Sequence, residues 1–201
     1  MSENPTTPEN QEVLNLHSEA KDAAASNNEE VLAFIEIPRG SRNKYEYDEE
    51  SGTFHLDRVL YSSVHYPTDY GFVPDTLADD GDHLDICVLM TEPSFPGCTI
   101  LARPLGGLEM TDEKGEDFKV LAVPVNDPRF NHYRRLEQVG KHWLKEIETF
   151  FATYKLLEGK ETNIVGWHGL ERALEEIEAS RKSYRAAQGE QKFVEKDSSA
   201  S

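Results

Sequence analysis

Three carboxylates crowd one short segment of the chain, because residues 80–85 read Asp-Gly-Asp-His-Leu-Asp. Like charges this close repel one another, so the segment is costly to fold unless cations neutralise it. Hard divalent ions prefer oxygen ligands, and Mg²⁺ combines a few carboxylates with water and substrate phosphate. The segment therefore predicts a divalent-cation site, with a solvated acidic loop as the alternative. A calcium EF-hand is excluded, because its loop needs Gly and Glu where this chain has Asp85 and Thr91.

A second acidic cluster lies at residues 112–119, which read Asp-Glu-Lys-Gly-Glu-Asp-Phe-Lys. By itself this composition is typical of the charged tip of a hairpin. If the fold brings the two clusters together, however, they can hold several metal ions. Adjacent metal ions clamp the attacking and leaving oxygens of an in-line phosphoryl displacement. Metal ions alone do not select phosphate, so such a site also needs positive side chains.

Cations and hydroxyls that could contact phosphate are scattered through the same part of the chain. Arg supplies a planar fork for phosphate oxygens, and Lys supplies a mobile point charge. Each residue also has an ordinary structural explanation: a solvated Lys, an Arg whose stem covers apolar surface, or a Tyr in the core. The candidates are Lys44, Arg58, Tyr70, Lys119, Tyr154 and Lys155.

Strands must position most of these groups. Residues 31–37 form an apolar run typical of a buried strand, and residues 44–48 and 53–60 alternate in character as strands do. The alternation in the last segment places Leu56 and Arg58 on one face and Asp57 on the other.

The remainder of the chain is predicted to be β-rich first and helical later. Residues 61–85 are rich in Pro, Gly, Tyr and Asp, which predicts an ordered functional loop. Apolar strands are expected at residues 86–90 and 99–104, and a hairpin is expected to pair residues 105–110 with 119–123. Apolar stripes of helical spacing cover residues 143–154 and 170–184.

A chain of 201 residues is long enough for one core, so a single domain is expected. Residues 1–30 and 188–201 are polar and predict disordered tails, which leaves a domain at residues 31–187. The tails contribute −6 and −1 to the formal net charge of −17, so the domain carries −10. That charge repels nucleic acid and anionic lipid, and cations are the expected partners.

Neither a secretory signal nor an apolar run of membrane-spanning length is found, so a cytoplasmic protein is expected. The two cysteines, Cys87 and Cys98, lie in apolar or turn surroundings. In such a chain they predict free thiols and no disulfide.

From residue 31 to about residue 185 the chain resembles the soluble family I inorganic pyrophosphatases of the compact bacterial type. The resemblance rests on several motifs that follow one another in family order, an arrangement that is hard to obtain by chance. In chain order these motifs are residues 35–38 (Ile-Glu-Ile-Pro), 42–46 (Arg-Asn-Lys-Tyr-Glu), 56–58 (Leu-Asp-Arg), 66–72 (Tyr-Pro-Thr-Asp-Tyr-Gly-Phe), 80–85, 110–119 and 150–155 (Phe-Phe-Ala-Thr-Tyr-Lys).

The resemblance implies a site for several Mg²⁺ ions, with Mn²⁺ or another divalent ion as a possible substitute. Asp80, Asp85 and Asp117 are expected to hold one ion, and Asp85 is also expected to reach a second. Asp112 with Asp117 is expected to hold a third, and Glu36 to help hold a fourth.

The resemblance also implies the substrate, inorganic pyrophosphate, and the fold. Lys44, Arg58, Tyr70, Lys119, Tyr154 and Lys155 match the phosphate-contacting positions of the family. Of these, Arg58, Tyr154 and Lys155 are expected on the leaving phosphate. The implied fold is α+β and β-rich, a five-stranded OB-like closed β-barrel flanked by helices, and the expected assembly is a homo-hexamer.

The hypothesis for the mechanism is a water activated by two metal ions, with a carboxylate that accepts its proton. Asp82 is the first candidate for this acceptor, since it stands between two predicted metal ligands without being needed as one. Asp117 is the second candidate. His83 departs from the family, which most often has Pro at this position, and this bears on metal choice and not on the reaction.

Two other functions compete with this interpretation. A phosphohydrolase acting on nucleoside triphosphates would share the carboxylates and lysines, but the chain has no Gly-rich phosphate loop of the Walker type. A non-catalytic OB-fold module would bind oligonucleotides. The negative charge of the domain argues against the second alternative.

Overall fold

The structure is a computed structural model that describes residues 30–198. The predicted N-terminal tail, apart from Glu30, therefore lies outside the described residues. The strands are β1 (Val31–Ile37), β2 (Asn43–Asp48), β3 (Thr53–Val59), β4 (Asp69–Val73), β5 (Leu84–Val88), β6 (Thr99–Asp112), β7 (Gly115–Pro124) and β8 (Asn163–Gly169). The helices are α2 (Lys141–Thr153) and α3 (Leu170–Ser198), with short 3-10 turns η1 (Pro128–Phe130), η2 (Leu136–Gln138) and η3 (Leu156–Glu158).

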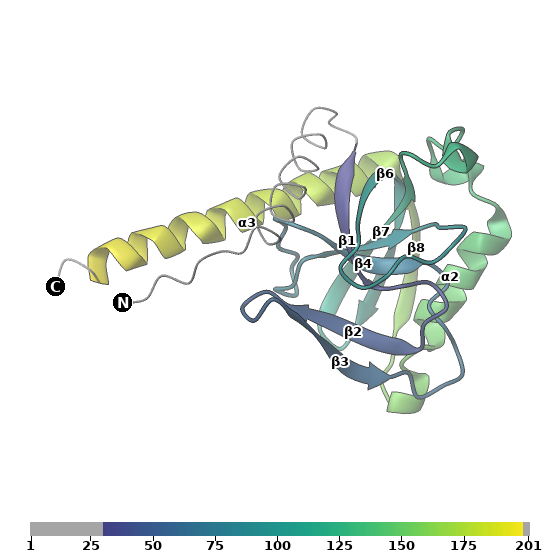
Figure 1. The fold of residues 1–201 in the computed structure, drawn as a ribbon, viewed down its shortest axis with the longest axis horizontal. Helices are drawn as coiled ribbons and strands as arrows, with labels where there is room; N and C mark the ends of the chain where they lie inside the picture. The colour runs from purple at the N-terminus through teal and green to yellow at the C-terminus, as the bar shows by residue number, and fades with distance from the viewer. Residues whose placement is uncertain (1–29, 199–201) are drawn as a thin grey trace, which may run out of the picture.

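Five strands form a closed ring of backbone pairings. The main sheet has the order β1-β4-β5-β7-β6-β8, and β1 pairs with β6 as well as with β4. This extra pairing, in which Val31 lies opposite Ala102, closes the ring and leaves β8 outside it on β6. The β2–β3 hairpin is a separate two-stranded sheet beside the ring (Figure 1). The closed five-stranded arrangement agrees with what the family resemblance implies, and its OB-like barrel character stays a prediction.

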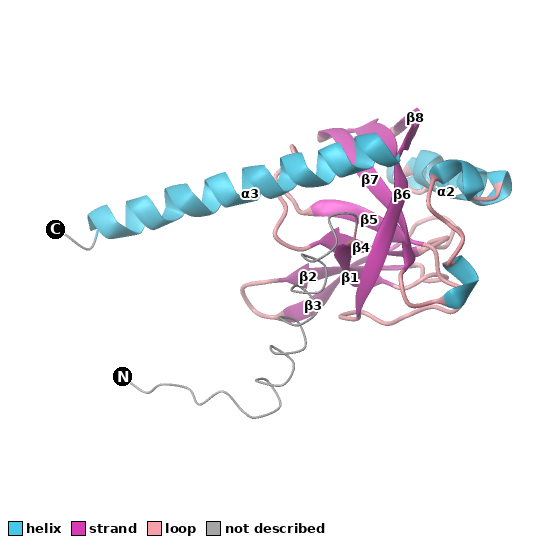
Figure 2. Ribbon diagram, turned by 90° about the horizontal axis from the view of Figure 1, so that it is seen from above, coloured by secondary structure: helices cyan, strands magenta, loops and turns pink. Residues whose placement is uncertain are grey.

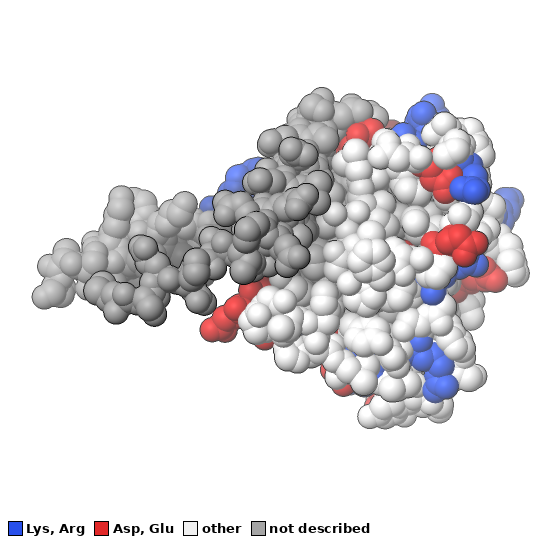
Figure 3. Space-filling view, in the orientation of Figure 1, with Lys and Arg blue, Asp and Glu red and all other residues white. Residues whose placement is uncertain are grey.

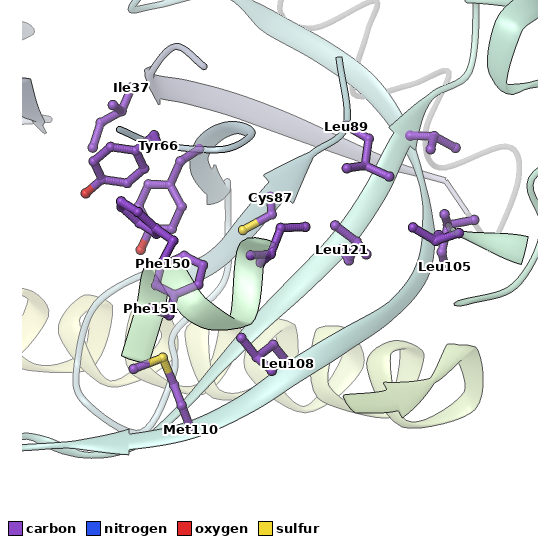
Figure 4. Packing of buried hydrophobic residues seen from close by; sticks show 14 of the residues in the cluster. Ile37, Tyr66, Cys87, Leu89, Leu105, Leu108, Met110, Leu121, Phe150 and Phe151 are labelled. Carbon is purple, nitrogen blue, oxygen red and sulfur yellow. The ribbon is translucent and has the colours of Figure 1, made fainter. Parts of the chain in front are cut away.

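Helices α2 and α3 lie against the ring strands (Figure 2), and each joins a different buried cluster. Side chains that alternate along a strand point to opposite faces. In β7, Leu121 belongs to a buried cluster that includes Ile147, Phe150 and Phe151 of α2. Its neighbour Val120 belongs to a second cluster, which includes residues of α3. Figure 4 shows Phe150 and Phe151 packed against the strand side chains of the first cluster.

The predicted loop at residues 61–85 is wrong in part, because it contains β4. Every residue of β4 is buried, so the segment lacks the alternation by which a half-exposed strand is recognised. Strand β8 was also not predicted. The two strands expected at residues 99–104 and 105–110 are one strand, β6, with an irregularity in its pairing to β7 between Pro104 and Gly106.

The last helix is longer than the sequence pattern suggests. The apolar stripe ends near Tyr184, and a disordered tail is predicted from residue 188, yet α3 continues to Ser198. Residues 188–198 include Glu, Gln and Lys, which have a high intrinsic preference for helix. Residues 199–201 lie outside the described part of the chain. No helix among residues 30–198 combines the length and apolar character needed to cross a membrane.

Gly71 lets β1 and β4 approach each other closely. It lies opposite Ile35, and an added methyl group would lie 1.9 Å from the backbone oxygen of Phe34. Because backbone atoms form this contact, a side chain at Gly71 cannot be accommodated without moving a strand of the ring.

Gly71→Ala is therefore expected to lower the free energy of unfolding by about 3 kcal/mol or more, because the extra methyl group overpacks two paired strands. Urea unfolding measures this change. Gly169→Ala is the control, since its methyl group would meet only the Glu171 side chain at 3.5 Å, an ordinary contact. Equal losses of unfolding free energy in the two variants would contradict the close approach of β1 and β4 at Gly71.

Candidate active site

All of the predicted site residues line one cleft with a volume of about 730 Å³. The cleft lies where the β2–β3 hairpin, the ring strands, the β6–β7 turn and the end of α2 meet. The predicted residues that line it are Glu36, Lys44, Arg58, Tyr70, Asp80, Asp82, Asp85, Asp112, Asp117, Lys119, Tyr154 and Lys155. The structure thus brings together both acidic clusters and the scattered cations, although the role of each residue stays a prediction.

Lys119 is a buried cation among the carboxylates of the cleft. Its Nζ lies 2.6 Å from an oxygen of Asp85 and 2.9 Å from both oxygens of Asp117, and it donates to the Tyr70 hydroxyl at 3.3 Å. Asp117 and Lys119 share a face of β7 because they are two residues apart. Asp85 lies on the neighbouring strand β5, which runs parallel to β7. The side chain of Lys119 is only 2% exposed, so this cation is held almost entirely by protein groups.

Burial and charge act against each other in this cluster. Burial would lower the pKa of Lys119, but the charges of Asp85 and Asp117 outweigh it and raise the pKa well above its ordinary value. For Asp117 burial is the larger effect, and it raises the pKa of the carboxyl despite the nearby Lys119 charge. The Lys119 charge therefore does not fully offset the cost of burying the Asp117 carboxylate, which favours the binding of further cations.

Bulges turn two acidic residues toward the cleft. On β1, Ile35 pairs with Gly71 and Ile37 pairs with Tyr70, so Glu36 is an extra residue between them. On β3, Asp57 is extra in the same way, because Lys44 pairs with Arg58 and Tyr45 with Leu56. A bulge re-aims side chains and is common beside functional sites. The expectation that Asp57 points away from Arg58 is therefore wrong, since both side chains line the cleft.

Glu36 is a carboxyl with an unusual affinity for its proton. Its carboxylate accepts a hydrogen bond from the backbone N–H of Tyr47 at 2.8 Å. Burial raises the pKa of Glu36 from 4.5 to about 7, and the Asp85 charge adds to this effect while the Tyr47 bond opposes it. The charged form of Glu36 is consequently costly unless a cation binds nearby.

A tight turn holds the acidic segment at residues 80–85. Gly81 adopts a positive φ of 89°, and the Asp82 N–H donates to the Asp80 carboxylate at 3.1 Å. Lys114, on the β6–β7 turn, reaches across to this segment and places its Nζ 2.6 Å from Asp82 and 3.7 Å from Asp80. His83 lies 2.7 Å from the carbonyl of Thr76 through Nδ1. The two acidic clusters are therefore in direct contact through Lys114.

The end of α2 contributes the opposite wall of the cleft. Tyr154 follows the last residue of the helix, and the chain turns through η3 to Gly159, whose φ of 70° is readily adopted by glycine. Lys155 extends from this turn and donates to Asp112 at 2.7 Å. Burial would raise the pKa of Asp112, but the hydrogen bond and charge of Lys155 and the backbone N–H of Lys114 together outweigh it and lower the pKa.

The Arg58 guanidinium has two carboxylate partners. Its Nε donates to Glu158 of η3 at 2.9 Å, and its Nη1 donates to Asp57. Asp57 also lies 3.4 Å from the Nζ of Lys44, so it connects two of the predicted phosphate-binding cations.

The donors in the cleft suit Mg²⁺ by their chemistry, because all of its acidic ligand candidates are hard oxygen donors. Within residues 30–198, however, no three acidic, His or Cys side chains converge as a ready-made metal cage. The carboxylates instead turn toward Lys114, Lys119 and Lys155. Metal binding would require these ammonium groups to give way or to turn to a bound phosphate.

The residues that sequence reasoning missed include three that contact predicted site residues. Asp57 lies inside the motif at residues 56–58, but strict strand alternation predicts that it faces away from Arg58. Lys114 lies inside the second acidic cluster, where its charge was not interpreted. Glu158 contacts Arg58 across 100 positions of the sequence, and no local pattern indicates such a pairing.

Charges of both signs lie on the face of the molecule that Figure 3 shows. Figure 3 shows Lys and Arg side chains interspersed with Asp and Glu along the edge on the side of α2, while the middle of this face carries few charges. The negative net charge of the chain is therefore not gathered into one large acidic patch on this face.

Comparison with known proteins gives a consistent result. The family model described as inorganic pyrophosphatase matches residues 33–185. The chain is 55% identical to the inorganic pyrophosphatase of Methanosarcina acetivorans over 150 residues, which is 75% of this chain and 89% of that protein. It is 54% identical to that of Geobacillus stearothermophilus over 154 residues, which is 77% of this chain and 93% of that protein. The crystal structure of the Thermus thermophilus inorganic pyrophosphatase superposes with a TM-score of 0.76 and 47% identity, covering 78% and 92% of the two chains.

Lys119→Met is expected to lower the free energy of unfolding by about 3–5 kcal/mol, because it leaves Asp85 and Asp117 without their buried partner. Urea unfolding at pH 7 in the presence of EDTA measures the effect. The matched control is Lys114→Met, which removes an ion pair with exposed partners and is expected to cost less than about 1 kcal/mol. Equal losses of unfolding free energy in Lys119→Met and Lys114→Met would contradict the buried pairing of Lys119 with Asp85 and Asp117.

A pH dependence follows from Glu36. Because its pKa is raised from 4.5 to about 7 in the folded protein, its contribution to stability is fully present below pH 4.5 and is lost as the pH rises through 7. The free energy of unfolding of the metal-free protein, measured relative to Glu36→Gln, is expected to fall by about 3 kcal/mol between pH 4.5 and 8. A difference that stays constant over this range would exclude the raised pKa.

Proposed function

Since the chain belongs to the inorganic pyrophosphatase family, we propose that it hydrolyses inorganic pyrophosphate to two orthophosphate ions in a site that holds several Mg²⁺ ions. The observation that supports this most is the single cleft in which every predicted metal ligand and every predicted phosphate contact meets. The cleft offers both signs of charge, as a complex of pyrophosphate with metal ions requires.

The cations of the cleft come from the β2–β3 hairpin, the ring and the end of α2, and several such groups suit a substrate with two phosphates. Arg58 of β3 and Tyr154 and Lys155 at the end of α2 are proposed to bind the leaving phosphate. Lys44, Tyr70 and Lys119 are proposed to contact phosphate from the hairpin and the ring. Positive groups that meet charge as it develops on the leaving phosphate stabilise the transition state.

The carboxylates Glu36, Asp80, Asp85, Asp112 and Asp117 are proposed to hold the ions. Bound Mg²⁺ would neutralise phosphate charge and acidify a water molecule, and Mn²⁺ could substitute for it. The protein itself must then accept the proton. Asp82 is the proposed acceptor. Among the described residues only the exposed Lys114 holds its carboxylate, whereas both oxygens of Asp117 are committed to buried Lys119.

The proposal extends to assembly and location. We propose a homo-hexamer in the cytoplasm, as the family resemblance implies. Light scattering of the purified protein tests the assembly.

Phosphate release from pyrophosphate and from ATP, with Mg²⁺, with Mn²⁺ and with excess chelator, tests the function. Release from pyrophosphate alone is expected, and it should be lost with chelator and fall at least about 100-fold in Asp85→Asn, which removes a metal-binding carboxylate. Glu178→Gln, which disrupts a surface ion pair with Arg181, is the control. Equal release from ATP would indicate a broader phosphohydrolase, and no release under any condition would refute the proposal.

The proton acceptor is tested by two substitutions. Asp82→Asn is expected to lower kcat about 100-fold or more with little change in KM, because it removes a general base without removing a substrate contact. Asp117→Asn is expected to change kcat, KM and stability together, since it also breaks the Lys119 pair. Full kcat in Asp82→Asn together with a loss in Asp117→Asn would transfer the role to Asp117.

A further inference from the structure

We propose that Glu158 is a positioning residue, which orients Arg58 toward the leaving phosphate. This inference rests on the proposed function and adds a residue that the family resemblance did not assign. Its basis is the contact between the Glu158 carboxylate and the Nε of Arg58 at 2.9 Å, formed between η3 and β3.

The contact lies in a protected position. The side chain of Glu158 is 8% exposed and that of Arg58 is 20% exposed. Burial would lower the pKa of Arg58, but the Glu158 and Asp57 carboxylates together outweigh it and raise the pKa, so the guanidinium stays charged. An ion pair shielded in this way is screened less by salt than an exposed pair.

Two carboxylates fix the plane of the Arg58 guanidinium. The group is planar and carries its N–H donors in a rigid fork. Glu158 holds Nε and Asp57 holds Nη1, so the direction of the remaining nitrogen is determined. Among the described residues, the Nη2 nitrogen of Arg58 has no hydrogen-bond partner. Arg58 also lines the cleft. The geometry therefore leaves one end of the fork available for a phosphate oxygen.

The position of Glu158 in the chain explains why it suits this task. It stands in the 3-10 turn that follows Tyr154 and Lys155, and Gly159 ends that turn. The contact between Glu158 and Arg58 therefore joins the β3 wall to the segment that carries the other two groups proposed for the leaving phosphate. All three groups are thereby held as one unit, and misplacement of such a unit by a fraction of an ångström costs rate.

A purely stabilising role for Glu158 is the competing explanation, and a double-mutant cycle separates the two. Hydrolysis of pyrophosphate with Mg²⁺ is measured for wild type, Glu158→Ala, Glu158→Gln, Arg58→Ala and the Glu158→Ala/Arg58→Ala double variant. Urea unfolding of each protein reports any loss of fold. Glu178→Ala, which removes an exposed acid from an ion pair with Arg181 on α3, controls for the loss of one carboxylate.

Glu158→Ala is expected to lower kcat/KM at least about tenfold, because the charged hydrogen bond that orients Arg58 is lost. Glu158→Gln keeps an oxygen that accepts from Nε, and its kcat/KM is expected within about threefold of wild type. In the Arg58→Ala background, adding Glu158→Ala should lower kcat/KM by less than about twofold, because no guanidinium is left to orient.

Three results would overturn the inference while leaving the proposed function intact. The first is an active wild type whose kcat/KM is unchanged in Glu158→Ala. The second is a Glu158→Gln variant with as low a kcat/KM as Glu158→Ala. The third is a double variant in which the two losses of kcat/KM are fully additive. A wild type that releases no phosphate from pyrophosphate would instead refute the proposed function, and the inference would fall with it.

Discussion

The accumulation of negative charge in one cleft is the constraint on which this structure depends. Carboxylates from β1, β5, β7 and the turns at residues 80–85 and 112–115 face a common space. Lys119 neutralises part of this charge from a buried position between Asp85 and Asp117. Burial, with the Asp85 charge as a smaller contribution, raises the pKa of Glu36 and of Asp117, so the charged form of each carboxyl is costly without a further cation. A site that keeps such an excess is suited to cations that arrive with a polyanionic substrate.

The architecture of the ring makes this concentration of charge possible. Closure through the β1–β6 pairing leaves a continuous frame, and α2 and α3 each add buried apolar contacts that offset the cost of the polar cleft. Bulges at Glu36 and Asp57 then turn acidic side chains out of the regular alternation. Because the functional groups come from strands and from the turn after α2, the frame fixes their relative positions.

Much of the fold and the site could be predicted from residue patterns, but features that depend on tertiary pairing could not. The apolar runs of β1 and β5 and the stripe of α2 follow from local periodicity. Strand β4 escaped prediction because burial on both faces removes the alternation. The face of Asp57 depends on a bulge, and the partner of Arg58 is Glu158, 100 residues away. Contacts of this kind are set by how the elements pack, and no local spacing encodes them.

The central claim is that the carboxylates of the cleft bind divalent cations. Calorimetric titration of Mg²⁺ into the substrate-free wild type and into the Asp85→Asn variant tests this claim most directly. The account predicts that Mg²⁺ binds the wild type and raises its unfolding temperature, and that the variant binds at least about tenfold more weakly, since it loses one hard oxygen ligand. Mg²⁺ binding of equal strength in both proteins, or no binding to either, would contradict it.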